Sequence, residues 1–584
     1  MDALEGAPEN LHRSGIAFGW RTDLRMVKLE GLGFSHKIHG KALPAFSGLD
    51  AEFPTGSISA IVGPSGCGKT SLLRVLAGLA PPSEGLATID GTAIQGVNPK
   101  VSIIFQDFGL LPWKTVRANV ELPLRLQGMA ASGRKTRVDP ILEELGLAPF
   151  SSLFPARLSG GMRQRVAVAR ALASRSEILL MDEPFSSLDA MTRESLQDTL
   201  LEVHARHRST VVIVTHSIEE AAYLADRIYV MGGRNPGRFT GMLEPCAEPG
   251  TRRGEILFPE KPVQKMRSPG DPGFPLPGAD EDRNRKRFRD DTRFRETTLA
   301  LRRMLEEGYI STSRTPPGEN PALPGAPSRR KTRLPRFFDR FLRMAFAAIV
   351  LGLLWAGAAQ AVRKPFLPPP GPALERLVQG LSSGSLLLHL GASTRRIFFS
   401  LLAAGPAAWA LGLLSGRVKA VGSVVSPFIY LLHPLPKVAF LPILMLFLGL
   451  GDGSKVALMG LVIFGQLFVG GRDAANAIQA PLVDSVLSLG KGRRAVLRHV
   501  ILPGTLPELF SSLRVSLGTA IAVLFLSETF ASMDGLGWYI MDAWSRVDYP
   551  DMYAAIVALS LFGLTLYVVI DLIEAVVCRW RETD

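Results

Sequence analysis

The sequence predicts an α/β domain built around a phosphate-binding loop, followed by an all-helical domain that crosses a membrane six times. Two observations lead to this fold class. Residues 57–79, SISAIVGPSGCGKTSLLRVLAGL, place a glycine-rich loop between an apolar strand and a helix. After about Phe337, apolar segments recur at lengths that can cross a bilayer. The chain of 584 residues is also too long for one hydrophobic core, so separate domains are expected.

The composition is an average over two unlike halves. Hydrophobic residues make up 47% and charged residues 20% of the chain, with the charge concentrated in the N-terminal half. A net charge of +13 is compatible with a nucleic-acid partner. However, much of the Lys and Arg excess lies between Arg252 and Arg343, just before the first apolar segment, where positive charge keeps a span end in the cytoplasm. We therefore expect a lipid bilayer as the partner, and no nucleic acid.

Cysteine usage and the N-terminus set further bounds. Cys67, Cys246 and Cys578 are far apart without CxxC spacing, which favours neither a disulfide framework nor a zinc site. The N-terminus lacks the basic-then-apolar pattern of a signal peptide. Residues 1–25 form an irregular leader, and Met26 directly precedes a strand-like stretch, so either methionine could be the start. In both cases we expect the first domain to lie in the cytoplasm.

The glycine-rich loop matches the GxxxxGK[ST] pattern that binds nucleotide phosphates. Its glycines let backbone N–H groups and the helix N-terminus face the phosphates. Lys69 would reach the β- and γ-phosphates, and the Thr70 hydroxyl would ligate Mg²⁺. A chance glycine turn is the alternative, and the flanking strand and helix argue against it. The residues expected to bind nucleotide here are Gly63, Pro64, Ser65, Gly66, Cys67, Gly68, Lys69, Thr70 and Ser71.

A second apolar strand ends in two carboxylates. Ile178-Leu-Leu-Met precedes Asp182 and Glu183, and four apolar residues in a row suit a parallel strand buried on both faces. Ligands bind at this end of such strands. We expect Asp182 to hold Mg²⁺ and Glu183 to act as the general base toward the attacking water. Two helix-capping acids would be the structural alternative.

Leu158-Ser-Gly-Gly-Met162 stands just before a helical stretch, so Ser159, Gly160 and Gly161 would form a second anion site at a helix N-terminus. Here the sequence resembles the ABC ATPases, whose signature is LSGGQ; Met162 replaces the Gln. In that family this site contacts the γ-phosphate of ATP held by the other subunit. The resemblance thus implies ATP and Mg²⁺ as cofactors and a dimer as the active unit.

Other motifs of that family follow in order. Gln106 matches the glutamine that senses Mg²⁺ and touches the membrane domain, and it is included with the expected metal and catalytic residues. Asp189, within Ser187-Leu-Asp, matches a conserved loop beside the nucleotide, and His216 matches the histidine that contacts the γ-phosphate. Phe34 matches the aromatic residue that stacks on adenine, although a core phenylalanine at a strand end fits equally. The resemblance covers roughly residues 26–310.

The apolar segments after Phe337 define the expected spans. A helix needs about 20 residues to cross a ~30 Å hydrocarbon core. The expected spans lie near 341–362, 393–415, 424–449, 455–473, 511–531 and 553–577, within a permease domain of residues 336–584. The third is interrupted by His433, Pro434, Pro436 and Pro442. A kinked or broken helix is therefore expected there.

Charge asymmetry gives the orientation. Basic clusters at 329–336, 417–419 and 491–498 fall on one face, while the last loop on the other face carries three aspartates. Six spans with both ends in the cytoplasm satisfy the positive-inside rule. Arg363 and Lys364 fall on the opposite face and do not fit this rule. Arg395 and Arg396 also lie near that face, so the start of the second span is left open.

Three acidic residues lie within or beside the predicted spans: Glu528, Asp571 and Glu574. Ionisable groups inside a membrane often mark function. These three lie near span ends, where such groups reach water or pair with a basic neighbour. We favour one of these two roles for all three and do not assign them to a solute.

Residues 484–503 carry the most informative membrane motif. Asp484-Ser-Val is followed by Gly490 and by Ile501-Leu-Pro503, which resembles the EAA loop of ABC importer permeases, with a degenerate front. In that family the loop forms a short cytoplasmic helix seated on the ATPase. The alternative is an amphipathic helix at the membrane surface with a basic face.

Further stretches narrow the resemblance to nitrate/sulfonate/taurine-type importers. They include FQDFGLLPW at 105–113, LHPLPKVAFLPILMLFLGLGDGSK at 432–455 and SETFASMDGLGWYI at 527–540. That family keeps ATPase and permease on separate chains, so the fusion is a departure. The resemblance implies a homodimer in the bacterial cytoplasmic membrane and a separate extracytoplasmic solute-binding protein. The sequence does not specify the solute.

Residues 244–290 form a basic, Pro- and Gly-rich insertion, and 311–335 a linker. Between them, residues 292–308 have helical periodicity and resemble the C-terminal helix of the family's ATPase. Two other functions remain open. An ABC exporter would normally place its membrane domain first and lack the EAA loop. A membrane-anchored ATPase with a mechanical or signalling role would not depend on a binding protein.

Overall fold

The computed structural model describes residues 26–38, 41–186, 188–233, 236–245, 292–309, 336–432, 434–530 and 532–581. The leader, most of the basic insertion, the linker and Ser187 lie outside these ranges. The described chain divides into two compact units. The first comprises Met1–Phe108, Ala167–Ser313 and Ser488–Gly490, and the second comprises Gly109–Val166, Arg314–Leu487 and Lys491–Asp584.

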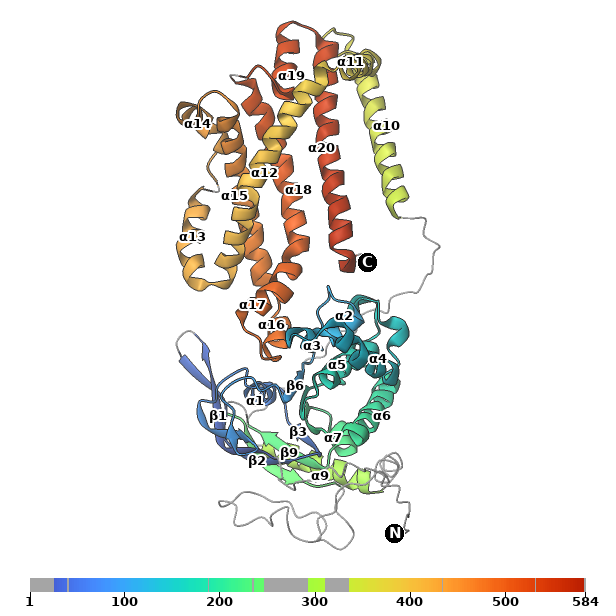
Figure 1. Ribbon diagram of the computed structural model, residues 1–584, viewed down its shortest axis with the longest axis vertical. Coiled ribbons are helices and arrows are strands. Elements are labelled where there is room, and N and C mark those ends of the chain that lie inside the picture. The colour runs from blue at the N-terminus through green and yellow to red at the C-terminus, as the bar shows by residue number, and fades with distance from the viewer. Residues whose placement is uncertain are drawn as a thin grey trace, which may run out of the picture. The chain divides into compact units, whose positions relative to one another are not determined.

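Two sheets organise the first unit (Figure 1). One is antiparallel, with the order β2-β1-β4-β5, and the other has the order β10-β9-β3-β8-β7-β6. In the second sheet β9, β3, β8, β7 and β6 are parallel and β10 pairs antiparallel with β9. The strands are β1 Met26–Ile38, β2 Lys41–Pro54, β3 Ile58–Val62, β4 Glu84–Ile89, β5 Thr92–Ala93, β6 Val101–Ile104, β7 Ile178–Asp182, β8 Thr210–Thr215, β9 Arg227–Gly232 and β10 Arg238–Leu243.

The parallel strands are apolar because helices cover them. Every residue of β3, β7 and β8 is buried, as the continuous hydrophobic runs predict for strands covered on both faces. The carboxyl ends of these strands therefore meet at one edge, where their loops are free to hold ligands. The helices of this unit are α1 Lys69–Leu76, α6 Ala190–His207, α7 Ile218–Leu224 and α9 Thr292–Tyr309, together with the C-terminal part of α5 Gly160–Ser174.

The second unit begins with a small helical segment and continues with a helix bundle. The small segment contains α2 Val116–Val120, α3 Leu122–Leu126, α4 Ala131–Glu144, η1 Ala148–Phe150, η2 Pro155–Arg157 and the start of α5. The bundle contains α10 Arg336–Val362, α11 Pro370–Ser382, α12 Ser385–Arg417, α13 Lys419–Leu432, η3 Lys437–Phe440, α14 Leu441–Leu448, α15 Asp452–Ala477, α16 Ala480–Leu487, α17 Arg493–Val496, η4 Leu497–Ile501, α18 Leu502–Thr529, α19 Leu536–Ser545, α20 Tyr549–Val577 and η5 Arg579–Arg581.

The bundle agrees with the expected number of spans. Within the described residues, five helices are long and apolar enough to cross a membrane, and a sixth span results if one bent pair is counted together. That pair is Lys419–Leu432 and Lys437–Leu448, which meet at 89°. The break falls where the prolines predicted it. The short helices α11 and α19 were not expected from the sequence.

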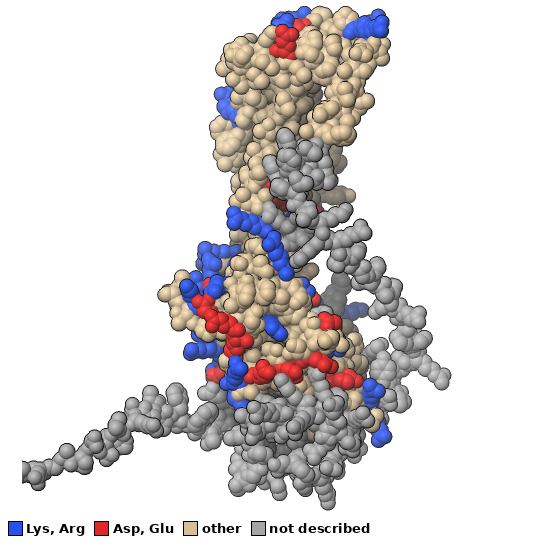
Figure 2. Space-filling view, turned by 90° about the vertical axis from the view of Figure 1, so that its right-hand side faces the viewer, with Lys and Arg blue, Asp and Glu red and all other residues tan. Residues whose placement is uncertain are grey.

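Helices α12, α15 and α18 pack side by side and form the centre of the bundle (Figure 1). Their buried side chains include Ile397, Leu458, Ile463 and Leu524. Many large apolar side chains point outward, such as Phe346, Leu388 and Phe447. Figure 2 shows a face of the bundle with few charged side chains between its two ends. A surface of this kind fits the hydrocarbon core of a bilayer.

Candidate nucleotide-binding site

The phosphate loop lies between the buried strand β3 and helix α1, as the sequence predicts. Gly66 and Gly68 have positive φ angles of 86° and 102°, which glycine adopts at little cost. A Cβ atom on Gly68 would also lie 2.9 Å from the Ala45 carbonyl oxygen. The loop conformation therefore depends on glycine at this position for two independent reasons.

Lys69 is buried and folded into this loop. Its Nζ donates to the carbonyl oxygens of Gly63, at 2.8 Å, and Pro64, at 2.9 Å. These two bonds hold the ammonium group against the loop backbone, on the path that nucleotide phosphates would take. The Cys67 thiol lies beside it, 4.0 Å from Nζ, and burial raises the pKa of that thiol.

The structure brings Thr70 and Asp182 together, although 112 residues separate them. The Thr70 hydroxyl donates to Asp182 Oδ1 at 3.1 Å. Burial raises the pKa of the Asp182 carboxyl to about 6, although the hydrogen bond from Thr70 opposes that shift. Hydroxyl and carboxylate oxygens are the ligand types that Mg²⁺ prefers, so this pair fits the expected metal.

Glu183 and His216 also meet. His216 Nδ1 lies 3.1 Å from Glu183 Oε2. Glu183 has a positive φ of 45°, and its N–H donates to the Val214 carbonyl at 2.8 Å. This backbone bond helps to hold a conformation that residues other than glycine rarely adopt. The expected base and the expected histidine therefore form one contact pair beside Asp182.

The remaining sequence-predicted residues of the first unit have different settings. Gln106 is exposed and directly follows β6 and Phe105. Asp189 caps helix α6, because its carboxylate accepts a hydrogen bond from the Thr192 N–H at 3.0 Å, which holds its pKa below the usual range. The capping contact gives Asp189 a structural role whatever its role toward nucleotide.

The expected adenine contact at Phe34 has a neighbour that the sequence reasoning missed. Phe34 is partly buried and packs against the core that contains Phe46, with ring centroids 6.1 Å apart. His36 lies two residues further along β1 and is exposed. Its ring stands edge-on to Phe34 at 4.9 Å, and its Nε2 lies 3.0 Å from the Ser71 hydroxyl on α1. The exposed ring beside the phosphate loop is therefore that of His36.

The signature segment lies at the start of α5, in the second unit. Ser159 is exposed, and its Oγ accepts a hydrogen bond from the Met162 N–H at 3.3 Å. Ser159 thus caps the helix with its side chain, and Gly160 and Gly161 form the first turn. This is the serine-and-glycine helix terminus that the sequence predicts.

Residues near the importer-like loop contact the small helical segment of the same unit. The Ser485 hydroxyl donates to the Gly109 carbonyl at 2.7 Å, and Trp113 Nε1 donates to the His499 carbonyl at 2.8 Å. A Cβ atom on Gly504 would lie 3.0 Å from the Trp113 ring. The family resemblance includes Trp113, but nothing in the sequence indicates that its N–H donates to the carbonyl of residue 499.

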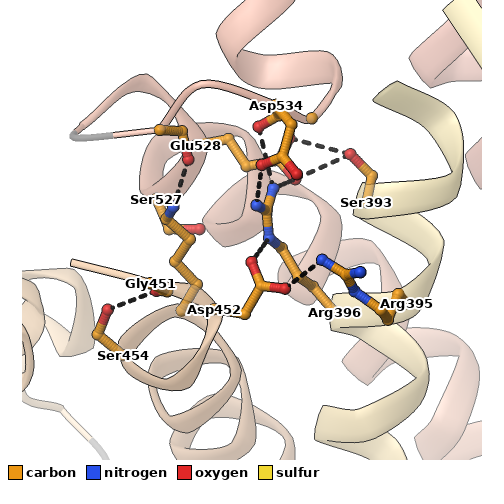
Figure 3. Close-up of polar contacts among 12 residues, drawn as sticks. Ser393, Arg395, Arg396, Gly451, Asp452, Ser454, Ser527, Glu528 and Asp534 are labelled. Carbon is orange, nitrogen blue, oxygen red and sulfur yellow. Dashed lines mark hydrogen bonds and ion pairs between the residues drawn. The ribbon is translucent and has the colours of Figure 1, made fainter. Parts of the chain in front are cut away.

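A charged cluster joins α12 to the N-terminus of α15 and the C-terminus of α18 (Figure 3). The Arg396 guanidinium donates to Asp452 at 2.7 Å and to Glu528 at 2.6 Å, and it also contacts the Asp534 carboxylate. Arg396 and Glu528 are fully buried. Glu528 also accepts hydrogen bonds from the Ser393 hydroxyl, at 2.8 Å, and from a backbone N–H. Of the two expected roles, reaching water or pairing with a basic residue, Glu528 therefore has the second.

The other two acidic residues of the spans are paired too. Arg514 contacts Asp571 at 2.9 Å and also contacts Glu574, and Arg581 reaches Glu574 at 3.1 Å. These contacts tie the middle of α18 to the C-terminal part of α20. The arginine partners Arg396 and Arg514 were not identified from the sequence, because they lie 132 and 57 residues from their acidic partners.

Known proteins resemble both halves of the chain. Residues 46–186 match the family model described as "ABC transporter", and residues 408–582 match "Binding-protein-dependent transport system inner membrane component". An "uncharacterized ABC transporter ATP-binding protein" of Methanocaldococcus jannaschii is 41% identical over 234 residues, which are 40% of this chain and 87% of the relative.

Two further relatives have more specific descriptions. An "aliphatic sulfonates import ATP-binding protein" of Burkholderia cenocepacia is 40% identical over 257 residues, covering 42% of this chain and 93% of the relative. A "nitrate import ATP-binding protein" of Synechocystis is 42% identical over 193 residues, covering 33% of this chain and 72% of the relative.

Proposed function

This chain belongs to the ABC transporter family, and from that premise we propose that it imports a small anionic solute of the nitrate or sulfonate type. One observation carries the proposal: an ATPase domain and a binding-protein-dependent permease domain lie on the same polypeptide. The relatives with specific descriptions are named for the import of sulfonates and nitrate, which are both anions. The fusion sets the ratio of ATPase to permease at one to one.

In the proposed reaction, Glu183 polarises the attacking water and His216 orients that carboxylate. Their 3.1 Å contact supports this pairing of roles. Lys69 would exchange its two carbonyl partners for phosphate oxygens when ATP enters the loop. Thr70 and Asp182 would hold Mg²⁺, which neutralises charge on the β- and γ-phosphates. Gln106, at the end of β6, would sense the occupied metal site.

We place the adenine contact at His36 and not at Phe34. A base can stack only on a ring face that is free, and the Phe34 ring is engaged by Phe46 and the core. The His36 ring is exposed, and its hydrogen bond to Ser71 orients it beside the loop. Phe34 then acts as the edge-on support for that ring.

The active unit in this proposal is a homodimer. Ser159, Gly160 and Gly161 of one copy would close over the ATP held by Lys69 of the other copy. An exposed, serine-capped helix terminus supports this role, because its N–H groups and dipole favour a γ-phosphate. Asp189 would lie in the loop between the two nucleotides.

We propose that the segment 484–503 transmits closure to the membrane helices. The bonds from Ser485 to Gly109 and from Trp113 to residue 499 support a connection between this segment and the small helical segment. Both termini would then lie in the cytoplasm, and a separate extracytoplasmic protein would deliver the solute to the opposite face.

The decisive experiment reconstitutes the purified full-length chain in lipid nanodiscs. ATP hydrolysis is measured alone and with binding proteins encoded beside the gene, each with candidate anions. Stimulation by one binding protein together with its anion is the expected result. Hydrolysis that no binding protein changes would refute import. Glu183→Gln should lower hydrolysis by about 10²–10⁴-fold, and full activity in that variant would remove Glu183 from the proposed role.

A further inference from the structure

The loop that carries His216 is held by a closed ring of hydrogen bonds. The Thr215 hydroxyl accepts from the Ser217 N–H at 3.0 Å and donates to Glu220 Oε2 at 2.6 Å. The Glu220 N–H in turn donates at 3.1 Å to the Ser217 hydroxyl, which caps helix α7. Because His216 lies between Thr215 and Ser217 in the chain, the Glu220 carboxylate helps to fix the backbone that carries the histidine.

The second carboxylate oxygen of Glu220 faces Arg193 on helix α6. Arg193 Nε lies 3.9 Å from Glu220 Oε1. The same guanidinium donates through Nη2 to the Leu188 carbonyl at 2.9 Å. Leu188 directly precedes Asp189, which caps α6. Arg193 therefore joins the loop that carries Asp189, after β7, to the loop that carries His216, after β8.

The contact between Arg193 and Glu220 is longer than a hydrogen bond, since an N–H···O bond spans about 2.7–3.2 Å. Arg193 Nε is buried and has no hydrogen-bond partner among the described residues. Glu220 is 4% exposed, so water competes little for its carboxylate. A buried donor beside a buried carboxylate is costly to leave unbonded. A movement of about 1 Å that brings the two atoms into bonding range is therefore favoured.

We propose that Glu220 and Arg193 are positioning residues for ATP hydrolysis, and that they act through His216. His216 Nδ1 lies 3.1 Å from Glu183 Oε2, so a displaced histidine backbone also displaces the partner of the proposed base. Arg193 makes the place of His216 depend on the loop of Asp189, which would lie between the two nucleotides of the dimer. This inference rests on the proposed function and adds two residues that set the geometry of its proposed catalytic pair.

Holding α6 and α7 together is the simpler role for this ion pair, and other contacts already serve it. The Tyr223 hydroxyl of α7 donates to Asp198 Oδ1 of α6 at 2.6 Å, further along both helices. Both helices also bury leucines, at Leu200 and Leu224. Removing the charge of Glu220 should therefore leave the packing of α7 in place and alter the loop ahead of it.

The test measures kcat and KM for ATP hydrolysis by the full-length protein in lipid nanodiscs, together with its melting temperature. Glu220→Gln keeps the shape of the side chain, and its amide oxygen can still accept from Thr215. Its NH2 group then faces Arg193 Nε, donor against donor. Glu220→Gln and Arg193→Gln should each lower kcat by about 10–100-fold, the effect of misplacing a catalytic group by about 1 Å. KM for ATP should stay close to the wild-type value, because neither residue belongs to the phosphate loop.

Glu219→Gln is the matched control. Glu219 precedes Glu220 on α7, but its side chain is 53% exposed and pairs with Arg302 at 3.2 Å. This variant should keep a kcat near that of wild type. The variant that combines Glu220→Gln with Arg193→Gln should lose no more kcat than either single variant, since both changes remove the same contact.

Three results would overturn the assignment. They are losses of kcat that multiply in the combined variant, an equal loss in Glu219→Gln, and a fall in melting temperature with kcat unchanged. Should Glu220→Gln fail to fold, Arg193→Gln and Glu219→Gln decide the question, because Arg193 is partly exposed. Wild-type hydrolysis and its stimulation by a binding protein, measured in the same nanodiscs, show whether the proposed function stands when the assignment of these two residues fails.

Discussion

Replacing Arg396 by methionine should destabilise the membrane domain far more than replacing its neighbour Arg395. The Arg396 side chain is 1% exposed and contacts three carboxylates, whereas the Arg395 side chain is 54% exposed and contacts only Asp452 among the described carboxylates. Both variants keep a long aliphatic side chain, so the comparison isolates the buried charge.

The magnitude follows from what each variant leaves behind. Arg396→Met leaves Glu528, which is fully buried, with hydrogen bonds but without its cation. Breaking a buried pair in this way costs about 3–5 kcal/mol. Arg395→Met removes an exposed pair that contributes about 0–1 kcal/mol. At roughly 2–4 °C per kcal/mol for a domain of this size, the melting temperature should fall by roughly 6–20 °C and by at most roughly 4 °C, respectively.

The assay is the melting temperature of the purified full-length protein in detergent, followed by intrinsic fluorescence. A double variant, Arg396→Met with Glu528→Gln, gives the sharper result. It removes the uncompensated charge, so it should melt above Arg396→Met alone. Two results would show that the buried pair does not hold these helices together. One is an equal fall in melting temperature for Arg395→Met and Arg396→Met. The other is a fall in the double variant that equals the sum of the falls in Arg396→Met and Glu528→Gln measured singly.

Three further predictions concern the ATPase domain and its connection to the membrane. His36→Ala should raise the KM for ATP several-fold in hydrolysis assays, with little effect on stability. Phe34→Ala should instead lower the melting temperature of the nucleotide-free protein, followed by fluorescence. Burial raises the pKa of Glu220, so the folded state favours its protonated form. The free energy of unfolding should therefore fall as pH rises through that pKa. Glu220→Gln should flatten this pH dependence of the melting temperature, recorded between pH 4 and pH 8. Trp113→Phe keeps the ring but removes the N–H bond to residue 499, so basal hydrolysis should persist while stimulation by the binding protein falls.

The local part of the nucleotide site could be predicted from sequence because it is encoded in short stretches. The loop from Gly63 to Thr70 sits between one strand and one helix, and glycines with positive φ are needed at fixed places within it. The meeting of Asp182 with Thr70 was also predictable, since parallel strands bring their carboxyl ends to one edge. The broken third span followed from the proline positions alone.

Contacts between distant residues of the same unit were not predictable in this way. Arg395 and Arg396 looked like exceptions to the positive-inside rule, but the structure pairs Arg396 with Glu528, 132 residues away. No periodicity links these positions, because their meeting depends on how α12 and α18 pack. Phe34 and His36 both lie on β1, and only the packing of Phe34 against Phe46 distinguishes the ring engaged with the core from the exposed ring.

The charge balance of the cluster around Arg396 indicates a structural role for it. In the cluster, Arg395, Arg396 and Lys455 oppose Asp452, Glu528 and Asp534, so three positive charges meet three negative ones. A neutral, fully bonded set holds helices together and exerts little pull on a passing anion.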